Sequence, residues 1–268
     1  MAESSDDVSK LKIISWNIKH FGRANLNLEA AAKLISEVDI VTFQEVNKSS
    51  GAQDALKKIS GLIASATGEK ICWGLSELPT EGKERYAYLW KNARISYVKT
   101  DGTIISDCTN TAVTIRLGVK HAEKIVREPS FGTFYFKSEK RHFVLASIHL
   151  LPTAKGPAKE IGPLFDTFAG VDQPLVIAGD FNMDSNEVGF ADIQKQGFLF
   201  AMSEQKTTIK KKSREMSKAY DNFWFRNIKL KSYKVLDLLG LFPQLEISEI
   251  NRTLSDHCPI QADFEFIK

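Results

Sequence analysis

The residues Leu175-Val-Ile-Ala-Gly-Asp-Phe-Asn182 join an apolar run to two polar side chains directly behind it. The run Leu175 to Ala178 is typical of a buried strand. Asp180 and Asn182 follow it with one residue between them, so both can point to the same side. Polar groups at strand ends meet at one rim of a sheet, where a cleft can form. This stretch therefore predicts a central strand that carries part of a functional site.

Four further segments repeat this arrangement. Each places an amide, a carboxylate or a histidine beside an apolar run that is typical of a strand. They are Trp16-Asn17 after Leu11 to Ser15, Gln44-Glu45 after Ile40 to Phe43, His149 after Phe143 to Ile148, and Ser255-Asp256-His257 before a strand that begins at Cys258. Together the five segments predict the chemistry of a metal-assisted phosphodiesterase.

Helices alternate with these strands in the first and third quarters of the chain. We predict helices over 27–38 with Asn27 as N-cap, over 52–66 closing at Gly68, from Pro157 through Phe168, and at about 187–196. The stretch from Ile71 to Phe136 indicates instead a mostly antiparallel meander. Its strands are expected at Tyr86 to Trp90, Ile95 to Val98, Ala112 to Leu117 and Phe131 to Phe136, with turns at Lys91-Asn92 and Asp101-Gly102. This order favours an α/β fold of two packed sheets flanked by helices.

Nothing in the 268 residues divides the chain. No Pro/Gly/Ser-rich linker or repeat interrupts it, and the polar segments extend from Asn17 to His257. We therefore expect a polar N-terminal segment at 1–10 and a single domain at 11–268.

The composition is that of a soluble globular protein, with 43% hydrophobic and 26% charged residues. A net charge of +3 excludes the strongly basic class that coats nucleic acid indiscriminately, so any anion binding must be local. The start of the chain has no apolar segment, and no run reaches the length of a membrane span. We expect a cytoplasmic protein with no membrane partner and no obligate protein partner, or a secreted one if a signal peptide has been removed.

Three cysteines, Cys72, Cys108 and Cys258, cannot all pair. They form no CxxC motif and no Cys/His cluster with zinc spacing. We expect buried, reduced thiols, which would suit a reducing compartment.

Jointly and in this order, the five segments resemble the endonuclease/exonuclease/phosphatase superfamily from about Lys12 to Phe266. The most specific pieces are Gly179-Asp180-Phe181-Asn182 and Ser255-Asp256-His257-Cys258-Pro259. Within the superfamily the chain is most similar to pancreatic-type deoxyribonucleases. Four further stretches carry that similarity, namely Lys83-Glu84-Arg85-Tyr86, Arg127-Glu128-Pro129, Ala158 to Phe168, and Ala219-Tyr220-Asp221. The resemblance implies a four-layer α/β sandwich.

Hard oxygen ligands suit Mg²⁺, or alternatively Mn²⁺ or Ca²⁺. Glu45 is the leading predicted metal ligand, because a bare carboxylate beside a buried strand is costly unless it is coordinated or hydrogen-bonded. Asp256 is a second carboxylate for the same ion or for the attacking water. Asn17 would support the metal or a phosphate oxygen through its amide. Each residue also has a structural interpretation, as a hydrogen-bonded strand-end or turn residue.

The resemblance implies roles for the remaining site residues. Asp180 would orient or deprotonate water, and Asn182 would donate to the developing oxyanion. Glu84 and Asp221 would hold His149 and His257, respectively, because a carboxylate on one ring nitrogen fixes the tautomer and keeps the imidazole protonated. The structural alternatives are an Asp/Asn turn, a solvated Glu84 and hydrogen-bonded core histidines. We expect His20, His121 and His142, which match no motif, to be surface or structural residues.

Two sources of positive charge are candidates for binding an anionic substrate. Arg127 resembles a phosphate-contacting arginine of the pancreatic-type enzymes. The run Lys206 to Lys218 lies just ahead of Asp221, and Lys210, Lys211 and Lys212 are its predicted substrate contacts. The alternative is that this run is a solvated loop.

Two departures from the pancreatic-type pattern fall on substrate contacts. Gly82 stands where that family has a groove-stacking tyrosine, and Asn47 where it has an arginine. Hydrolysis of a phosphate ester is therefore better supported than the identity of the ester. A DNA endonuclease is the first prediction, a phosphatase or phosphodiesterase for a small or lipid phosphate the second, and a non-catalytic binding module the third.

Overall fold

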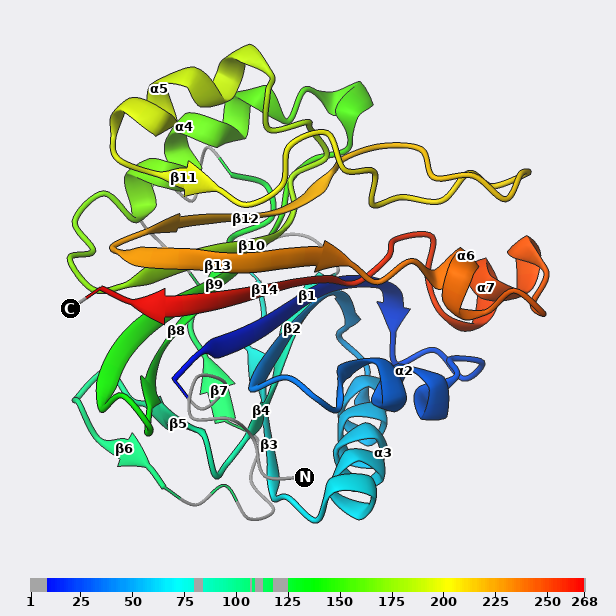
Figure 1. Cartoon of the computed structure of the whole chain (residues 1–268), viewed down its shortest axis with the longest axis horizontal. Coiled ribbons are helices and arrows are strands. Elements are labelled where there is room, and N and C mark those ends of the chain that lie inside the picture. The colour runs from blue at the N-terminus through cyan, green and yellow to red at the C-terminus, as the bar shows by residue number, and fades with distance from the viewer. Residues whose placement is uncertain (1–8, 80–83, 107, 109–112, 118–124, 268) are drawn as a thin grey trace.

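The computed structural model describes residues 9–79, 84–106, 108, 113–117 and 125–267. Within them, two seven-stranded sheets pack face to face (Figure 1). The first contains, in spatial order, β13 (Ile228–Val235), β14 (Ile260–Phe266), β1 (Leu11–Phe21), β2 (Ile40–Asn47), β4 (Glu84–Lys91), β3 (Ile71–Ser76) and β7 (Val113–Ile115). The second contains β11 (Leu199–Phe200), β12 (Asp221–Arg226), β10 (Leu175–Asp180), β9 (Arg141–His149), β8 (Ser130–Phe136), β5 (Ile95–Val98) and β6 (Ile104–Ile105).

Six α-helices among the described residues cover the outer faces of the two sheets (Figure 1). The first sheet is covered by α2 (Leu28–Ile35), α3 (Ser50–Thr67), α6 (Leu238–Leu241) and α7 (Ile247–Thr253). The second is covered by α4 (Ala158–Thr167) and α5 (Ala191–Lys195), preceded by the 3₁₀ turns η2 (Thr153–Lys155) and η3 (Val188–Phe190). The expected four-layer α/β sandwich is therefore confirmed.

Alternation along β1 shows why this sequence forms a layered fold. Leu11 and Ile13 pack in the apolar core between the sheets. Ile14 and Trp16 belong to the core beneath the helices of the first sheet. Successive side chains of a strand point to opposite faces, so an unbroken apolar run fills two cores at once.

Two predicted caps are confirmed, namely Asn27 at the start of α2 and Gly68 at the end of α3. The side chain of Asn27 accepts a hydrogen bond from the Ala30 amide (3.0 Å) at the start of α2. Gly68 has φ 73° after α3 and donates its amide to the carbonyl of Ala64 (2.8 Å). A glycine adopts this left-handed conformation without a Cβ clash, so it ends the helix at low cost.

The stretch from Ile71 to Phe136 is mostly antiparallel, as predicted, since β3 pairs with β4, β5 with β6 and β5 with β8. It is not one continuous meander, because the turn at Lys91-Asn92 leads from β4 in the first sheet to β5 in the second, and β3 pairs with β7 in parallel. Of the two predicted turns, the one at Asp101-Gly102 joins a hairpin, β5 to β6. Short alternating runs look alike whether consecutive strands pair or change sheets, because local periodicity carries no information on partners.

The expectation of three reduced thiols is also wrong. Cys72 and Cys108 form a disulfide, with their Cα atoms 5.6 Å apart, and only Cys258 is a free, buried thiol. Cys72 lies in β3, and the fold brings Cys108 to it across 36 residues of sequence. That proximity depends on tertiary structure and could not be read from the spacing.

Several sequence predictions lie outside the described residues. They concern the segment 1–8, Gly82, Lys83, Ala112 at the start of a predicted strand, and His121. Among the helices that are described, none has the length and apolar character needed to cross a membrane.

Candidate active site

Strand pairing brings three predicted catalytic residues to one rim of the second sheet. Asp180 at the end of β10 lies in register with His149 at the end of the parallel strand β9. On its other side it lies in register with Asp221, the first residue of the antiparallel strand β12. The predicted meeting of polar residues at strand ends is therefore confirmed here, within the second sheet.

Gly179 allows this close approach of β10 and β9. Its φ is 150°, and a Cβ atom at this position would lie 2.0 Å from the carbonyl oxygen of Ile148. Any larger residue would push the two strands apart, so the glycine in the Gly-Asp-Phe-Asn stretch is needed for the register that places Asp180 beside His149.

Asn17 connects the two sheets at the same rim. It lies in β1, in register with Gln44 of β2. Its Nδ2 donates to Glu45 Oε1 (3.2 Å) and to Asp180 Oδ2 (3.1 Å). One amide thus bridges carboxylates that come from different sheets, and its Oδ1 accepts from the amide of Lys19 (3.2 Å).

His149 and Glu84 form the first predicted carboxylate–histidine pair, with 2.8 Å between Nδ1 and Oε2. Arg127 Nε lies 3.5 Å from the same oxygen. Burial opposes the charge of Glu84, but the hydrogen bond from His149 and the positive charges of His149 and Arg127 lower the pKa of this carboxyl. Glu84 is therefore an ionised partner that fixes Nδ1 and leaves Nε2 of His149 facing the site.

His257 and Asp221 form the second pair, also with 2.8 Å between Nδ1 and the carboxylate oxygen Oδ2. The hydroxyl of Thr207 donates to that oxygen (2.6 Å) and accepts from the Asp221 amide (3.1 Å), which holds the carboxylate in place. Burial disfavours an imidazolium here, but the charges of Asp221 and Asp180 prevail and raise the pKa of His257 to about 10. His257 is therefore a proton donor at neutral pH.

The two pairs converge on Asp180. Its Oδ2 lies 3.5 Å from Nε2 of His149 and 3.7 Å from Nε2 of His257. Its side chain is buried, and this burial raises the pKa of the carboxyl, although the two histidines oppose the effect. A buried carboxyl with a raised pKa is suited to accept a proton from water.

Two groups of side chains have the chemistry of a divalent-metal site. The first group consists of Glu45, Glu84 and His149, and the second consists of Asp180, Asp221 and His257. Within each group the candidate ligand atoms lie within 4.8 Å of one another. Carboxylate oxygens suit Mg²⁺, Ca²⁺ or Mn²⁺, whereas an imidazole nitrogen suits transition metals. The donors present therefore fit a divalent cation. Glu45 belongs to the first group, and its role as a metal ligand stays a prediction.

Asp256 pairs with a lysine, whereas the sequence suggested a metal ion or the attacking water as its partner. Its Oδ2 forms an ion pair with Lys19 Nζ at 2.7 Å. Burial opposes its charge, but the hydrogen bond from Lys19 and the charge of His257 lower the pKa of this carboxyl. Asp256 is thus an ionised residue at the rim that pairs with an ammonium, and its role as a metal ligand stays a prediction.

Asn182 and Arg127 both contact the backbone at the end of β9. Asn182 Nδ2 donates to the carbonyl of Leu150 (3.0 Å), and so does Arg127 Nη1 (2.8 Å). The predicted oxyanion contact of Asn182 and phosphate contact of Arg127 would use their remaining N–H groups, and both stay predictions.

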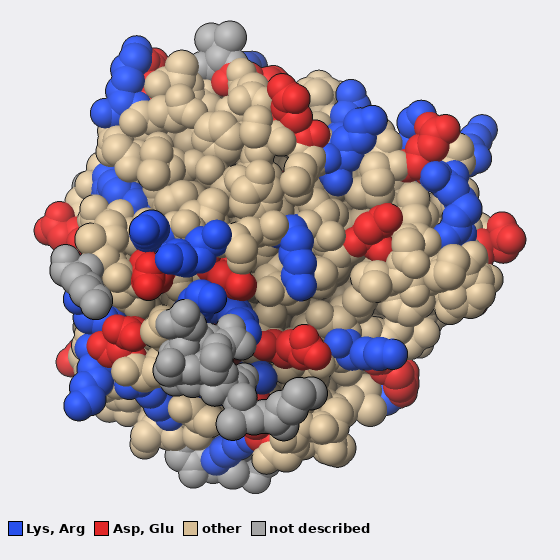
Figure 2. Space-filling model, viewed as in Figure 1, with Lys and Arg blue, Asp and Glu red and all other residues tan. Residues whose placement is uncertain are grey.

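The basic run forms a projecting loop whose base is at the active site. Thr208 bridges to His257 and Ile209 to Met216, and the loop extends beyond the sheets (Figure 1). Lys210 pairs with Glu215, whereas Lys211 and Lys212 are exposed. Arg214 donates to the carbonyls of Leu239, Phe242 and Leu245, so it anchors the loop. Both signs of charge are interspersed over this face of the molecule (Figure 2).

Three residues near the site escaped the sequence analysis. Lys19 and Thr207 bind Asp256 and Asp221, respectively. His20 is exposed, as expected, but its Nδ1 lies 3.6 Å from Glu45 Oε2. Only the position of Lys19 and His20, two and three residues after Asn17, could have signalled their proximity, whereas Thr207 carried no signal.

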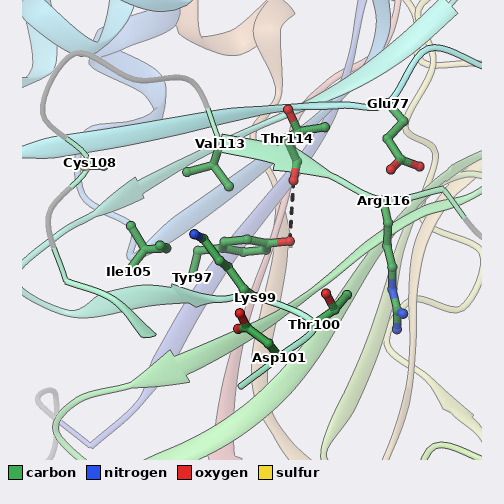
Figure 3. Close-up of a pocket in the computed structure, with 10 residues that line it drawn as sticks. All are labelled: Glu77, Tyr97, Lys99, Thr100, Asp101, Ile105, Cys108, Val113, Thr114 and Arg116. Carbon is green, nitrogen blue, oxygen red and sulfur yellow. Dashed lines mark hydrogen bonds between the residues drawn. The ribbon is translucent and has the colours of Figure 1, made fainter. Parts of the chain in front are cut away.

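A separate cavity of about 500 Å³ opens between β7 and the β5–β6 hairpin (Figure 3). Tyr97, Ile105 and Val113 form its apolar wall, and Lys99 and Arg116 are charged residues that also line it. None of the paired histidines and carboxylates lines it, so the predicted catalytic residues lie at the rim and not in this cavity.

The comparisons with known proteins agree with this geometry. Residues 14–257 match the model of the Endonuclease/Exonuclease/phosphatase family, and the chain belongs to that family. Its members are divalent-metal-dependent hydrolases of phosphate esters. The chain is 25% identical to a protein named Deoxyribonuclease from Thioalkalivibrio sp. (strain K90mix), over 96% of this chain and 72% of the relative.

Solved structures share the fold. A mannosyl-6-phosphatase from Bacteroides thetaiotaomicron VPI-5482 has a TM-score of 0.64 at 16% identity, covering 96% of this chain and 100% of that one. TDP2 of D. rerio, complexed with a single-strand DNA product, has a TM-score of 0.60 at 15% identity, covering 96% and 99%. At these identities the likeness supports the fold and not a particular substrate.

Proposed function

We propose that this protein is a divalent-metal-dependent endonuclease that hydrolyses the phosphodiester bonds of DNA. The observation that carries the proposal is the convergence of two carboxylate–histidine pairs on Asp180, with the Nε2 atoms of His149 and His257 both facing its Oδ2. Hydrolysis of a phosphodiester needs a group that activates water, a group that protonates the leaving oxygen, and positive charge at the phosphate. The rim offers all three.

Each step can be assigned to a residue of this chain. Asp180 accepts the proton of the attacking water, because its raised pKa makes it a competent base. His257 is protonated at neutral pH and gives a proton to the departing oxygen as the phosphorus–oxygen bond breaks. Glu84 orients His149, whose Nε2 is placed to donate to a phosphate oxygen.

The metal site is assigned to Glu45, with Asp256 and Asn17 as the other proposed ligands. Mg²⁺, or alternatively Mn²⁺ or Ca²⁺, would supply charge neutralisation at the phosphate when bound. Asn17 already links Glu45 to Asp180, so binding at Glu45 would place the cation beside the base.

The relative named Deoxyribonuclease supports a nucleic-acid substrate. Arg127 and the exposed Lys211 and Lys212 would contact its phosphates. A phosphatase or phosphodiesterase for a small or lipid phosphate is the second candidate. Asn47 favours this candidate, because it stands where the pancreatic-type enzymes have a substrate-binding arginine. Its Nδ2 donates to the carbonyl of His20 (3.5 Å). A non-catalytic binding module is less well supported, because both acid–histidine pairs are intact.

Release of acid-soluble fragments tests the proposal. Plasmid, single-stranded DNA, RNA and a small phosphate monoester are each incubated with Mg²⁺, with Mn²⁺ and with a chelator. We expect cleavage of DNA that the chelator abolishes. Turnover of the monoester without cleavage of any polynucleotide would favour the phosphatase, and no turnover of any substrate would favour the binding module.

The cellular location is a separate proposal. The expected cytoplasmic location suits reduced thiols, but a disulfide between Cys72 and Cys108 suits an oxidising compartment. We therefore favour the secreted alternative, which fractionation of the producing cells would test.

A further inference from the structure

His20 lies in a strained part of the backbone beside the proposed metal ligand. Lys19 has φ 46°, His20 has φ 56° and Glu45 has φ 57°, although none of them is a glycine. Such conformations are costly for residues with a Cβ and are retained mainly where the surrounding structure or a function requires them. Here they turn the end of β1 toward the bend in β2 that presents Glu45.

Backbone contacts fix His20 in this position. Its amide donates to Glu45 Oε2 (3.3 Å). Its carbonyl accepts from the Arg23 amide (3.1 Å) and from Asn47 Nδ2 (3.5 Å). Asn47, the residue that departs from the pancreatic-type pattern, therefore helps to hold the loop that carries the imidazole.

The imidazole and the Glu45 carboxylate have the spacing of two ligands of one ion. His20 Nδ1 lies 3.6 Å from Glu45 Oε2, and 62% of the His20 side chain is exposed, so an ion can enter from solvent. Ligand bonds of about 2.0–2.2 Å place two adjacent ligand atoms roughly 2.8–3.1 Å apart at octahedral angles and roughly 3.3–3.6 Å apart at tetrahedral angles. The observed separation matches tetrahedral angles and would have to close by roughly 0.5–0.8 Å for octahedral ones.

A second carboxylate also lies near Glu45. A Glu84 oxygen lies within 4.8 Å of a Glu45 oxygen, in the group that also contains His149. Asp256, by contrast, forms an ion pair with Lys19. The polar neighbours of Glu45 in this structure are therefore the His20 imidazole, the Asn17 amide and the Glu84 carboxylate.

We propose that His20 is a nitrogen ligand of the cation bound at Glu45, and that the site consequently prefers Mn²⁺ to Mg²⁺ and Ca²⁺. This inference rests on the proposed metal-dependent function. Imidazole is a borderline ligand that suits transition metals, whereas Mg²⁺ and Ca²⁺ favour oxygen alone. The competing interpretation is an ordinary ion pair between a protonated His20 and Glu45.

Pulsed electron paramagnetic resonance of bound Mn²⁺ distinguishes the two, because it detects a directly bonded imidazole nitrogen. The test variant is His20→Asn, since asparagine tolerates a positive φ. The matched control is His142→Asn, at the start of β9, where the ring packs against Tyr135 with centroids 5.1 Å apart. We expect a nitrogen coupling in the wild type and in the control, and its loss in His20→Asn.

Calorimetric titrations of the same proteins give a second measurement. In His20→Asn, affinity for Mn²⁺ should fall about tenfold or more, which is a typical cost of disturbing a metal site, while affinity for Mg²⁺ should change far less. His20→Asp, which supplies an oxygen, should keep Mn²⁺ binding without the nitrogen coupling and should narrow the preference over Mg²⁺.

A wild type that binds Mn²⁺ without nitrogen coupling, or a coupling that persists in His20→Asn, would overturn the assignment of His20. If that protein still cleaves DNA, the proposed function survives the loss of this inference. If the wild type neither binds Mn²⁺ nor cleaves any phosphate ester, both proposals fail together.

Discussion

His149 and Asp180 end neighbouring parallel strands in direct register, and Nε2 of the imidazole lies 3.5 Å from Oδ2 of the carboxylate. The contact depends on the pairing of β9 with β10, because a shift of one residue in their register would turn one of the two side chains to the opposite face of the sheet. Gly179 permits the register by letting the backbone of β10 approach Ile148. The arrangement at this rim leads to four predictions.

Glu45→Gln should abolish most activity and weaken metal binding, because the amide removes the charge that holds a hard cation. Calorimetric titration with Mg²⁺ and Mn²⁺ measures the binding directly. Glu37→Gln, an exposed carboxylate at the end of α2, is the control that loses the same charge elsewhere. Unchanged affinity in Glu45→Gln would remove Glu45 from the metal site.

His149→Ala and His257→Ala should each lower kcat by about a hundredfold or more, the usual contribution of a general acid or base. Glu84→Gln and Asp221→Asn should lower it as well, because each removes the carboxylate charge that orients an imidazole. Rates are compared per folded molecule, with folding checked by thermal unfolding. Full activity per folded molecule in any of these variants would assign that residue a structural role alone.

The metal-free protein should lose stability as the pH rises. The pKa of His257 is about 10 in the folded chain, above its ordinary value of 6.5. Stabilisation from the protonated imidazole is therefore fully present below pH 6.5 and is lost as the pH rises toward 10. Denaturant unfolding with a chelator present should show this decline in the wild type and a weaker one in His257→Gln.

Nuclear magnetic resonance of the His257 ring in the same metal-free protein measures the pKa itself. Asp221→Asn should lower it, because Asp221 is the strongest of the charges that favour the imidazolium. A ring that titrates near 6.5 in the wild type would refute the assignment of His257 as a proton donor at neutral pH.

Replacing Lys211 and Lys212 with Ser should raise KM for polynucleotides and flatten its salt dependence, since fewer counterions are released on binding. Lys210 is kept in this variant because it pairs with Glu215. The matched control replaces Lys57 and Lys229, exposed lysines in α3 and β13.

A small chromogenic phosphodiester separates the possible outcomes for this loop, because it spans no such surface. Its cleavage should hardly change in the lysine variant. An equal loss on both substrates would indicate damage to the site. No loss on either would make the run a solvated loop and favour a small-phosphate substrate.

Most of the fold was predictable from local pattern. Apolar runs such as Leu175 to Ala178 form strands, and Asn27 and Gly68 cap the helices that were expected, because caps and periodicity act within a few residues. The predicted meander is divided between the two sheets because strand pairing is not a local property. Whether β5 pairs beside β4 or joins the other sheet depends on contacts between residues far apart in the sequence.

The candidate site divides in the same way. The sequence by itself predicted which side chains would carry the chemistry, since Asp180, His149 and His257 follow or precede recognisable strands, and the resemblance paired the two histidines with Glu84 and Asp221. Only the tertiary structure decided that Lys19 forms an ion pair with Asp256, that His20 lies beside Glu45 and that Cys72 forms a disulfide with Cys108. The physical reason is the sequence separation over which each interaction acts. Strand formation and capping are local, whereas ion pairs, metal ligands and disulfides depend on distances that arise only when the two sheets pack together.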